Sequence, residues 1–256
     1  MGLAPKSKLN RLLLEVEQGK LVFSSWLKKR GYSDQLLKQY RLSGWLTSLA
    51  GGVMCRAGAK LTAIAAISSY DEQMEKSLRI AAHSALELFG FRYYQVNGCK
   101  PTMVICHHYN EILPQWLIET DFDYELKFFR TRIFPQEHTY TYHVGSIDIL
   151  TSTPEQAFLE CLILAPQYYK LTDLYQIMKQ LSTLKAEILQ PLLESVQSNK
   201  VKRLFLYMAQ KVHHTWYEQI DPSKIEIGTG KYQIANHGIY IPEYKMTIPK
   251  ELYNTE

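Results

Sequence analysis

The side chains best suited to binding a ligand lie in residues 35–41, where the sequence reads QLLKQYR. Leu36, Leu37 and Tyr40 recur at helical spacing and predict one buried face. Four polar side chains are left to face solvent, and they are Gln35, Lys38, Gln39 and Arg41. Glutamine and arginine can pair with purine edges in the major groove of DNA, while lysine neutralises phosphate. The pattern therefore indicates a helix whose exposed face contacts a DNA duplex.

The flanking residues supply a start and a stop for this helix. Gly31 ends the preceding helix, Ser33 is the predicted N-cap, and Asp34 suits the positive end of the helix dipole. Ser43 and Gly44 end the helix on the other side. We therefore expect the helix to begin at Ser33 and to end before the next apolar run.

A hairpin and two further helices complete the expected unit. Residues 45–49 and 53–56 predict two strands joined by a turn at Gly51 and Gly52, where φ must be positive. Helical spacing predicts earlier helices over 5–18 and 20–30. The second ends in Lys28, Lys29 and Arg30, which are expected to interact with the helix dipole first and with phosphate second. The order indicates a winged helix-turn-helix, and the residues predicted to contact DNA are Lys28, Lys29, Ser33, Gln35, Lys38, Gln39, Arg41, Arg56 and Lys60.

The distribution of charge supports this interpretation. Residues 1–60 contain eleven Lys or Arg and three Asp or Glu, a net charge of +8, while the rest of the chain has a net charge of −4. A concentrated positive field is what a phosphate-binding surface needs. Two alternatives to DNA binding remain open. One is an ordinary helical hairpin whose polar face is only exposed to solvent, and the other is a solvated basic surface with no partner.

Length and composition indicate the class of protein and the number of domains. The chain has 256 residues, of which 46% are hydrophobic and 21% charged, so a globular protein of two domains is expected. We predict a winged-helix domain with a connector helix over 1–76 and a second domain over 77–256. No apolar run is long enough for a membrane span, no secretion signal is recognisable, and the four cysteines show no disulfide framework. These features favour a cytoplasmic protein.

The rest of the chain predicts a mixed α/β region followed by a helical layer and short antiparallel strands, which makes the fold class α+β. The expected elements after the connector helix at 60–76 are a short strand, a helix at 84–89, strands around Asn97-Gly98, helices at 153–164 with Thr153 as N-cap, 171–181, 184–197 and about 201–212, and strands within 224–248.

Several motifs resemble enzyme sites, but each lacks a required residue at the required spacing. Gly228-Thr229-Gly230-Lys231 lacks the first glycine of a phosphate loop and has Tyr232 where Ser or Thr would hold magnesium. Cys106-His107-His108 has no second ligand pair at zinc spacing. Gly145-Ser146 with Asp148 lacks the second aspartate of a nucleotidyltransferase. We therefore predict neither catalytic residues nor a metal or other cofactor.

The chain also resembles a known family over nearly its whole length. The pattern GWL…GGV is followed by SALELFGFRYYQ, LPQWL, RTRIF, STPEQAFLECL, LLESVQSNKVKRLFLYMA and IEIGTGKYQI…GIYIPEYKMTIPKE. This order is similar to that of the AbiEi-type antitoxins of bacterial abortive-infection systems. One departure is that Ala81-Ala82 stands where many relatives carry a glycine pair, which bears on the local turn.

The resemblance implies an antitoxin that is also a transcriptional autorepressor, and not an enzyme. Its winged helix would bind inverted repeats in the promoter of its own operon, as a monomer in solution or a dimer on DNA. Its second domain would counteract a nucleotidyltransferase-like toxin, by direct contact or indirectly. Lys200, Lys202 and Arg203 match the family's basic helix start and form a candidate surface for a partner or DNA, or else a solvated helix turn. The alternative function is a stand-alone regulator with a ligand-sensing second domain.

Overall fold

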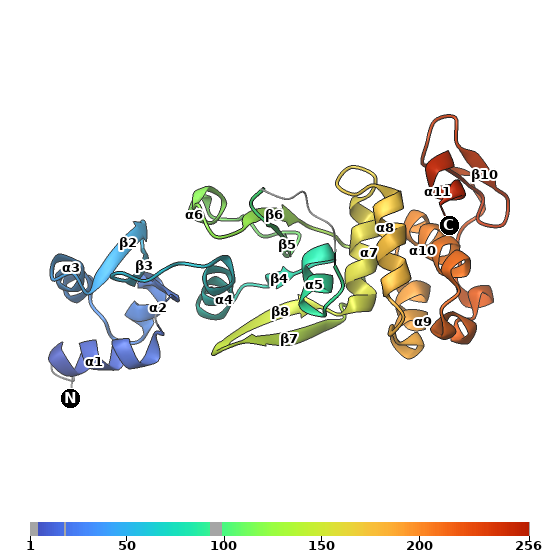
Figure 1. Ribbon diagram of the computed structural model, residues 1–256. Helices are drawn as coiled ribbons and strands as arrows, with labels where there is room; N and C mark the ends of the chain where they lie inside the picture. The colour runs from blue at the N-terminus through green and yellow to red at the C-terminus, as the bar shows by residue number, and fades with distance from the viewer. Residues whose placement is uncertain (1–4, 18, 93–98, 256) are drawn as a thin grey trace. The chain divides into compact units, whose positions relative to one another are not determined.

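The computed structural model describes residues 5–17, 19–92 and 99–255, with helices and strands in two compact units (Figure 1). The first unit comprises 1–79, 98–128 and 141–150, and the second comprises 80–97, 129–140 and 151–256. Among the described residues, no helix is both long and apolar enough to cross a membrane. The predicted division into domains 1–76 and 77–256 stays a prediction.

The first unit begins with a winged helix-turn-helix, as the sequence predicts. Its strands pair antiparallel in the order β1-β3-β2. In chain order its elements are α1 (Pro5–Glu15), β1 (Leu21–Phe23), α2 (Ser24–Lys29), α3 (Asp34–Leu42), β2 (Leu46–Ala50) and β3 (Val53–Arg56). The predicted α+β class with an N-terminal winged helix is confirmed.

The second helix is shorter than predicted because its first residues form a strand. Leu21, Val22 and Phe23 pair with Cys55, Met54 and Val53 of β3, and all three are buried. A run of three apolar residues has no periodicity of its own, so its partners decide its conformation. The expectation of a helix over 20–30 is therefore wrong for 21–23 and right for α2.

The turn of the hairpin is tied to the start of α2. Gly52 has a φ of +78°, which favours glycine, and its carbonyl accepts a hydrogen bond of 2.8 Å from the backbone N–H of Ser24. A Cβ atom at Gly52 would lie 2.8 Å from Ser24 Oγ. Of the two glycines of the turn, Gly52 is thus the one whose lack of a side chain the fold requires.

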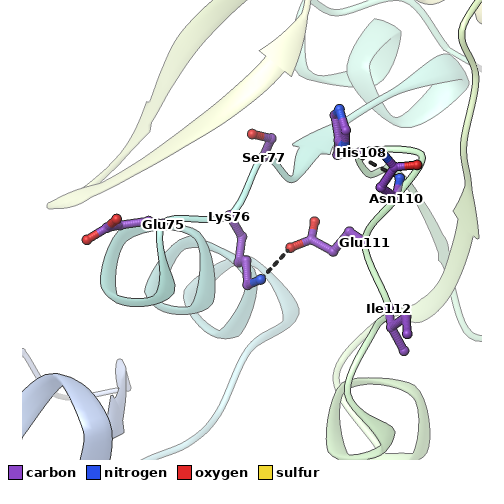
Figure 2. A pocket seen from close by; sticks show the side chains of 7 residues that line it. All are labelled: Glu75, Lys76, Ser77, His108, Asn110, Glu111 and Ile112. Atoms are coloured by element: carbon purple, nitrogen blue, oxygen red, sulfur yellow. Dashed lines mark hydrogen bonds and ion pairs between the residues drawn. The ribbon is translucent and has the colours of Figure 1, made fainter.

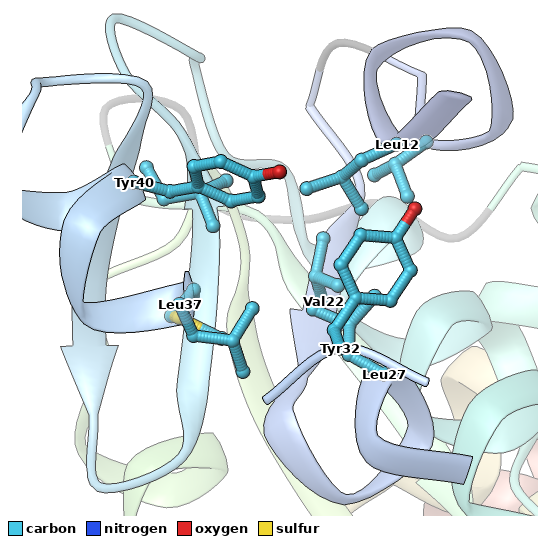
Figure 3. Close-up of a cluster of buried hydrophobic side chains, with 9 residues drawn as sticks. Leu12, Val22, Leu27, Tyr32, Leu37 and Tyr40 are labelled. Carbon is cyan, nitrogen blue, oxygen red and sulfur yellow. The ribbon is translucent and has the colours of Figure 1, made fainter. Parts of the chain in front are cut away.

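Nine buried side chains form the core of the winged helix, and Figure 3 shows how those from α1, α2 and α3 meet above the sheet. Leu37 and Tyr40 of α3 point into this core, as their spacing predicts, and Leu36 packs at its edge. The members are Leu12, Val16, Val22, Leu27, Tyr32, Leu37, Tyr40, Leu46 and Met54.

Helix α4 (Ala63–Met74) packs against the outer edge of β1. Ser69 Oγ accepts a hydrogen bond of 3.0 Å from the N–H of Leu21. Gln73 accepts from the N–H of Phe23 at 3.1 Å and donates to the carbonyl of Leu21 at 2.7 Å. Polar groups on the edge of a buried strand need such partners. The helix predicted over 60–76 spans 63–74, and it serves as the lateral partner of the winged-helix sheet.

The same unit continues through β5 (Thr102–Cys106), α6 (Gln115–Glu119) and most of β6 (Glu125–Phe129). The rings of Phe23, Tyr70 and Trp116 lie 5.6 to 5.8 Å apart and join β1, α4 and α6. A five-stranded sheet has the order β6-β5-β4-β8-β7, where the remaining strands are β4 (Arg79–Ile80), β7 (Thr139–Val144) and β8 (Ile147–Ser152).

The second unit contains the predicted helical layer. Its helices are α5 (Ala82–Leu88), α7 (Pro154–Leu164), α8 (Leu171–Gln180), α9 (Ala186–Ser195), α10 (Asn199–Val212) and α11 (Lys250–Asn254), with 3-10 turns η1 (Thr215–Gln219) and η2 (Pro222–Lys224). Thr153 is the N-cap of α7, as predicted, although its hydroxyl makes no capping hydrogen bond.

Three details of the second unit differ from the sequence predictions or lie beyond them. The strands β9 (Tyr232–Gln233), β10 (Ile239–Ile241) and β11 (Met246–Ile248) form a mixed sheet, because β11 pairs antiparallel with β10 and parallel with β9. Helix α5 begins at Ala82, two residues earlier than expected, with a φ of +50° there. The turn predicted at Asn97-Gly98 falls outside the described residues.

Two leucines of α3 provide a test of this packing. Leu37 is 1% exposed and Leu42 is 78% exposed. We expect Leu37→Ala to lower the free energy of unfolding by about 2–5 kcal/mol because it leaves a cavity in the winged-helix core. Leu42→Ala should change it by less than about 0.5 kcal/mol. Urea denaturation followed by circular dichroism measures both, and equal effects would contradict the assignment of the buried face.

Candidate nucleic-acid interface

Helix α3 is held at its start by two side-chain contacts. Ser33 Oγ accepts a hydrogen bond of 3.2 Å from the N–H of Leu36, so Ser33 is the N-cap as predicted. The carboxylate of Asp34 pairs with Lys28 Nζ at 2.8 Å. This ion pair joins the end of α2 to the start of α3 across the turn between them. It also neutralises part of the positive charge of Lys28, a residue that the sequence predicts to contact phosphate.

The exposed face of α3 carries the polar side chains that the periodicity placed there. Because Leu37 and Tyr40 occupy the core, Gln35, Lys38 and Gln39 are exposed. Lys38 forms no ion pair within the described part of the chain. Gln35 lies in the first turn of the helix, the part that approaches base edges in helix-turn-helix complexes.

Arg41 links the last turn of α3 to the wing. One of its Nη nitrogens lies 3.5 Å from the sulfur of Met54 in β3, while the residue as a whole is exposed. Trp45, which follows the helix, is 47% exposed. Arg41 therefore presents a guanidinium whose position is set by both the helix and the sheet.

Arg56 lies at the base of the wing. It pairs with Leu46 at the start of β2, far along the hairpin from the turn at Gly51 and Gly52. Its guanidinium donates a hydrogen bond of 3.3 Å to the carbonyl of Leu13 in the last turn of α1, where helix carbonyls lack partners. The residue as a whole is half-buried. Arg56 thus joins α1 to the sheet.

The other predicted basic residues differ in how they are held. Lys29 and Lys60 are exposed. Arg30, which follows Lys29 in the chain, stacks its guanidinium 3.6 Å from the centre of the Trp26 ring. The four-residue spacing of Trp26 and Arg30 on a helix was the signal that could have identified this contact.

Two hydroxyl residues of the wing were not anticipated. Thr47 and Ser48 are exposed in β2, between the base of the hairpin and its turn. Hydroxyl groups commonly bond to phosphate oxygens. The turn itself is uncharged, and a hollow beside it is lined by Leu49, Ala50 and Gly51 together with Gln115, Trp116, Glu119 and Thr120 around α6.

The ionisable groups behind this surface stay neutral. Burial raises the pKa of the Tyr32 and Tyr40 hydroxyls and of the Cys55 thiol. None of the three is then ionised near pH 7. The positive charge of the surface therefore comes from its lysines and arginines.

The basic residues at the start of α10 donate hydrogen bonds to backbone carbonyls. Arg203 is 2% exposed and donates to the carbonyls of Ile227 at 2.9 Å, Lys245 at 3.0 Å and Gly228 at 3.2 Å. Lys202 is 6% exposed, and its Nζ donates to the carbonyl of Glu194 at 3.1 Å. The prediction of a partner or DNA surface is wrong for both residues.

Lys200 has a similar role. Its Nζ donates to the carbonyls of Ile163 at 2.9 Å and Ala165 at 2.5 Å, at the end of α7. Lys202 does the same at the end of α9. Burial lowers the pKa of both amines. Cationic side chains satisfy helix carbonyls that have no partner within their own helix.

The sequence motifs with enzyme-like residues lie in ordinary structural settings. Cys106 and His107 are buried and His108 is exposed. Gly228 is in the turn that Arg203 binds. Among the described residues, no three His, Cys, Asp or Glu side chains are grouped so that they could hold a metal ion.

Comparisons with known proteins decide the family. Residues 5–96 match the model of the AbiEi antitoxin N-terminal domain, described as a transcriptional regulator. Residues 100–249 match the model described as transcriptional regulator, AbiEi antitoxin, type IV toxin-antitoxin system. The chain belongs to the AbiEi antitoxin family of transcriptional regulators. The resemblance found in the sequence is confirmed.

A solved structure supports the fold of this AbiEi-family chain. The crystal structure of the RV2827C protein from Mycobacterium tuberculosis aligns with a TM-score of 0.62 at 14% identity, over 94% of this chain and 89% of that one. At this identity the likeness concerns the fold alone. No curated protein matches the chain.

Arg203 allows a test of its structural role. Arg203→Lys removes donors from carbonyls that are buried with it, and we expect it to lower the free energy of unfolding by about 1–3 kcal/mol. Arg92→Lys, at an exposed position of the same unit, should change it by less than about 0.5 kcal/mol. Chemical denaturation compares the two. Unchanged stability together with weaker DNA binding in Arg203→Lys would restore the surface role.

Proposed function

We propose that this chain is a DNA-binding autorepressor and antitoxin that acts through two separate parts. The winged helix binds inverted repeats in the promoter of its own operon. The second domain counteracts a nucleotidyltransferase-like toxin. Membership of the AbiEi antitoxin family supports the pairing of these two roles.

The observation that carries the DNA-binding role is the exposed face of α3. Gln35, Lys38, Gln39 and Arg41 are exposed together on the helix that the winged-helix order makes the recognition helix. The N-terminal 60 residues also carry the net charge of +8. Shape and charge thus favour the same surface.

The residues of this surface divide by the contact that each can make. Gln35 and Gln39 can form two hydrogen bonds to adenine in the major groove, and Arg41 can do so with guanine. Lys38, Lys29 and Lys60 suit phosphate. Lys28, Ser33 and Arg56 have structural partners and are proposed to contribute through their remaining exposed atoms.

Replacement of Lys38 tests the phosphate role. We expect Lys38→Ala to weaken binding to operator and unrelated DNA alike, because one phosphate contact and its released counterion are lost. The slope of log K against log salt concentration should fall in magnitude by about 0.9. Fluorescence anisotropy with labelled duplexes at several salt concentrations measures both quantities.

Two variants serve as comparisons for Lys38→Ala. Lys250→Ala removes an exposed lysine from α11 and should change neither affinity nor slope. Gln35→Ala should reduce the preference for operator over unrelated DNA and leave the slope unchanged, as expected for a base contact. If Lys38→Ala behaves like Lys250→Ala, α3 is not the recognition helix.

The proposal assigns repression to the winged helix and rescue from the toxin to the second domain. We expect the double variant Lys38→Ala, Arg41→Ala to lose repression of an operon-promoter reporter and to keep its ability to rescue cells from the toxin. Expression of the variant and of the toxin from independent promoters, with growth as the readout, tests this. A folded double variant that fails to rescue would contradict the separation of roles.

A further inference from the structure

A polar pocket lies beside the end of α4 in the first unit, with the loop after β5 forming its other wall (Figure 2). It is distinct from the surface proposed to bind DNA. The residues that line it are Glu75, Lys76, Ser77, His108, Asn110, Glu111 and Ile112.

Glu111 is the buried charged group of this pocket. Its side chain is 8% exposed, and its Oε1 forms an ion pair of 3.0 Å with Lys76 Nζ. The other carboxylate oxygen, Oε2, is shielded from solvent and accepts no hydrogen bond from the described residues. Figure 2 shows it directed away from Lys76, toward the side of the pocket where Ser77 and His108 lie. A buried acceptor without a donor is costly, so Oε2 needs a donor that a ligand can supply.

The surrounding charges favour a cation as the source of this donor. The carboxylates of Asp71, Glu75 and Glu111 outnumber the single amine of Lys76. Burial raises the pKa of Asp71, and the nearby charge of Glu111 raises it further. An anionic ligand such as phosphate would be repelled.

The other groups of the pocket indicate which kind of cation it binds. His108 Nδ1 accepts a hydrogen bond of 3.3 Å from the N–H of Asn110, so the neutral ring carries its proton on Nε2. The described residues offer no group of three metal-ligating side chains. An organic cation with N–H donors fits better than a metal ion.

The carboxylate of Glu111 and the apolar rim of the pocket favour arginine over other cations. A guanidinium is flat, keeps its charge, and presents several N–H donors in a plane that matches a carboxylate. Ile112, at the rim, is 90% exposed. A small free cation would leave this side chain in water, whereas the neighbours of an arginine in a polypeptide can cover it.

We propose that this pocket binds an arginine side chain presented by a partner protein. The guanidinium donates to Glu111 Oε2, and residues adjacent to that arginine pack on Ile112. Arginine is a common anchor of protein interfaces. The inference does not depend on DNA binding or on toxin rescue.

Three probes test the proposal on the unaltered full chain. They are the peptide acetyl-Gly-Leu-Arg-Leu-Gly-amide, its citrulline analogue, and arginine amide, each titrated by isothermal calorimetry. Citrulline keeps the shape of arginine and loses its charge. We expect the arginine peptide to bind about tenfold more tightly than the citrulline peptide and than arginine amide.

Variants then locate the site. Glu111→Gln should weaken binding of the arginine peptide about tenfold, and Glu119→Gln, at an exposed position of α6 outside the pocket, should leave it unchanged. Ile112→Ser should weaken binding of the peptide and not that of arginine amide. Thermal unfolding shows whether each variant is folded, and operator binding should be normal in all of them.

Several results would overturn the proposal. They are the absence of binding by any probe, equal affinity for the arginine and citrulline peptides, and unchanged binding in folded Glu111→Gln. Equal affinity for arginine amide and the peptide would assign the pocket to a small guanidinium compound and overturn the protein partner. The comparison of the peptides uses the unaltered protein, so it holds even where a variant does not fold.

Discussion

The hydrogen bonds between the backbone of β1 and the side chains of Ser69 and Gln73 decide how the winged-helix unit is built. Strand β1 has three residues and pairs with β3 on one side only. Without α4, the N–H and carbonyl of Leu21 and the N–H of Phe23 would lie at an open strand edge without these partners. The aromatic contacts of Phe23 with Tyr70 and Trp116 add apolar burial at the same edge. The winged helix therefore depends on a helix that follows it in the chain.

The same principle recurs in the second unit, where long cationic side chains take the place of Gln73. Lys200 and Lys202 bond to carbonyls at the ends of α7 and α9, and Arg203 bonds to three carbonyls of the segment between η2 and β11. One turn of α10 thus holds three other segments. A cluster of basic residues in a sequence does not by itself establish a charged surface in the fold, and here Lys202 and Arg203 are buried.

The parts that could be predicted from the sequence are those with local causes. The spacing of Leu36, Leu37 and Tyr40 defines both the buried and the exposed face of α3, and Ser33 marks its start. The strand at 21–23 has non-local causes, since its partners lie in β3 and α4, about 30 and 50 residues later. The same holds for Arg203, whose partner carbonyls are 24 to 42 residues away. Periodicity carries no information about such partners.

The bond between the N–H of Ser24 and the carbonyl of Gly52 limits how this wing can be redesigned. Any residue inserted between Gly51 and Val53 would separate that carbonyl from α2, and any side chain at position 52 would meet Ser24 Oγ. An engineer who wants to extend the reach of the hairpin must therefore keep the turn as it is. Added cations belong at Thr47 and Ser48, whose exposed side chains leave room for longer ones without disturbing the core.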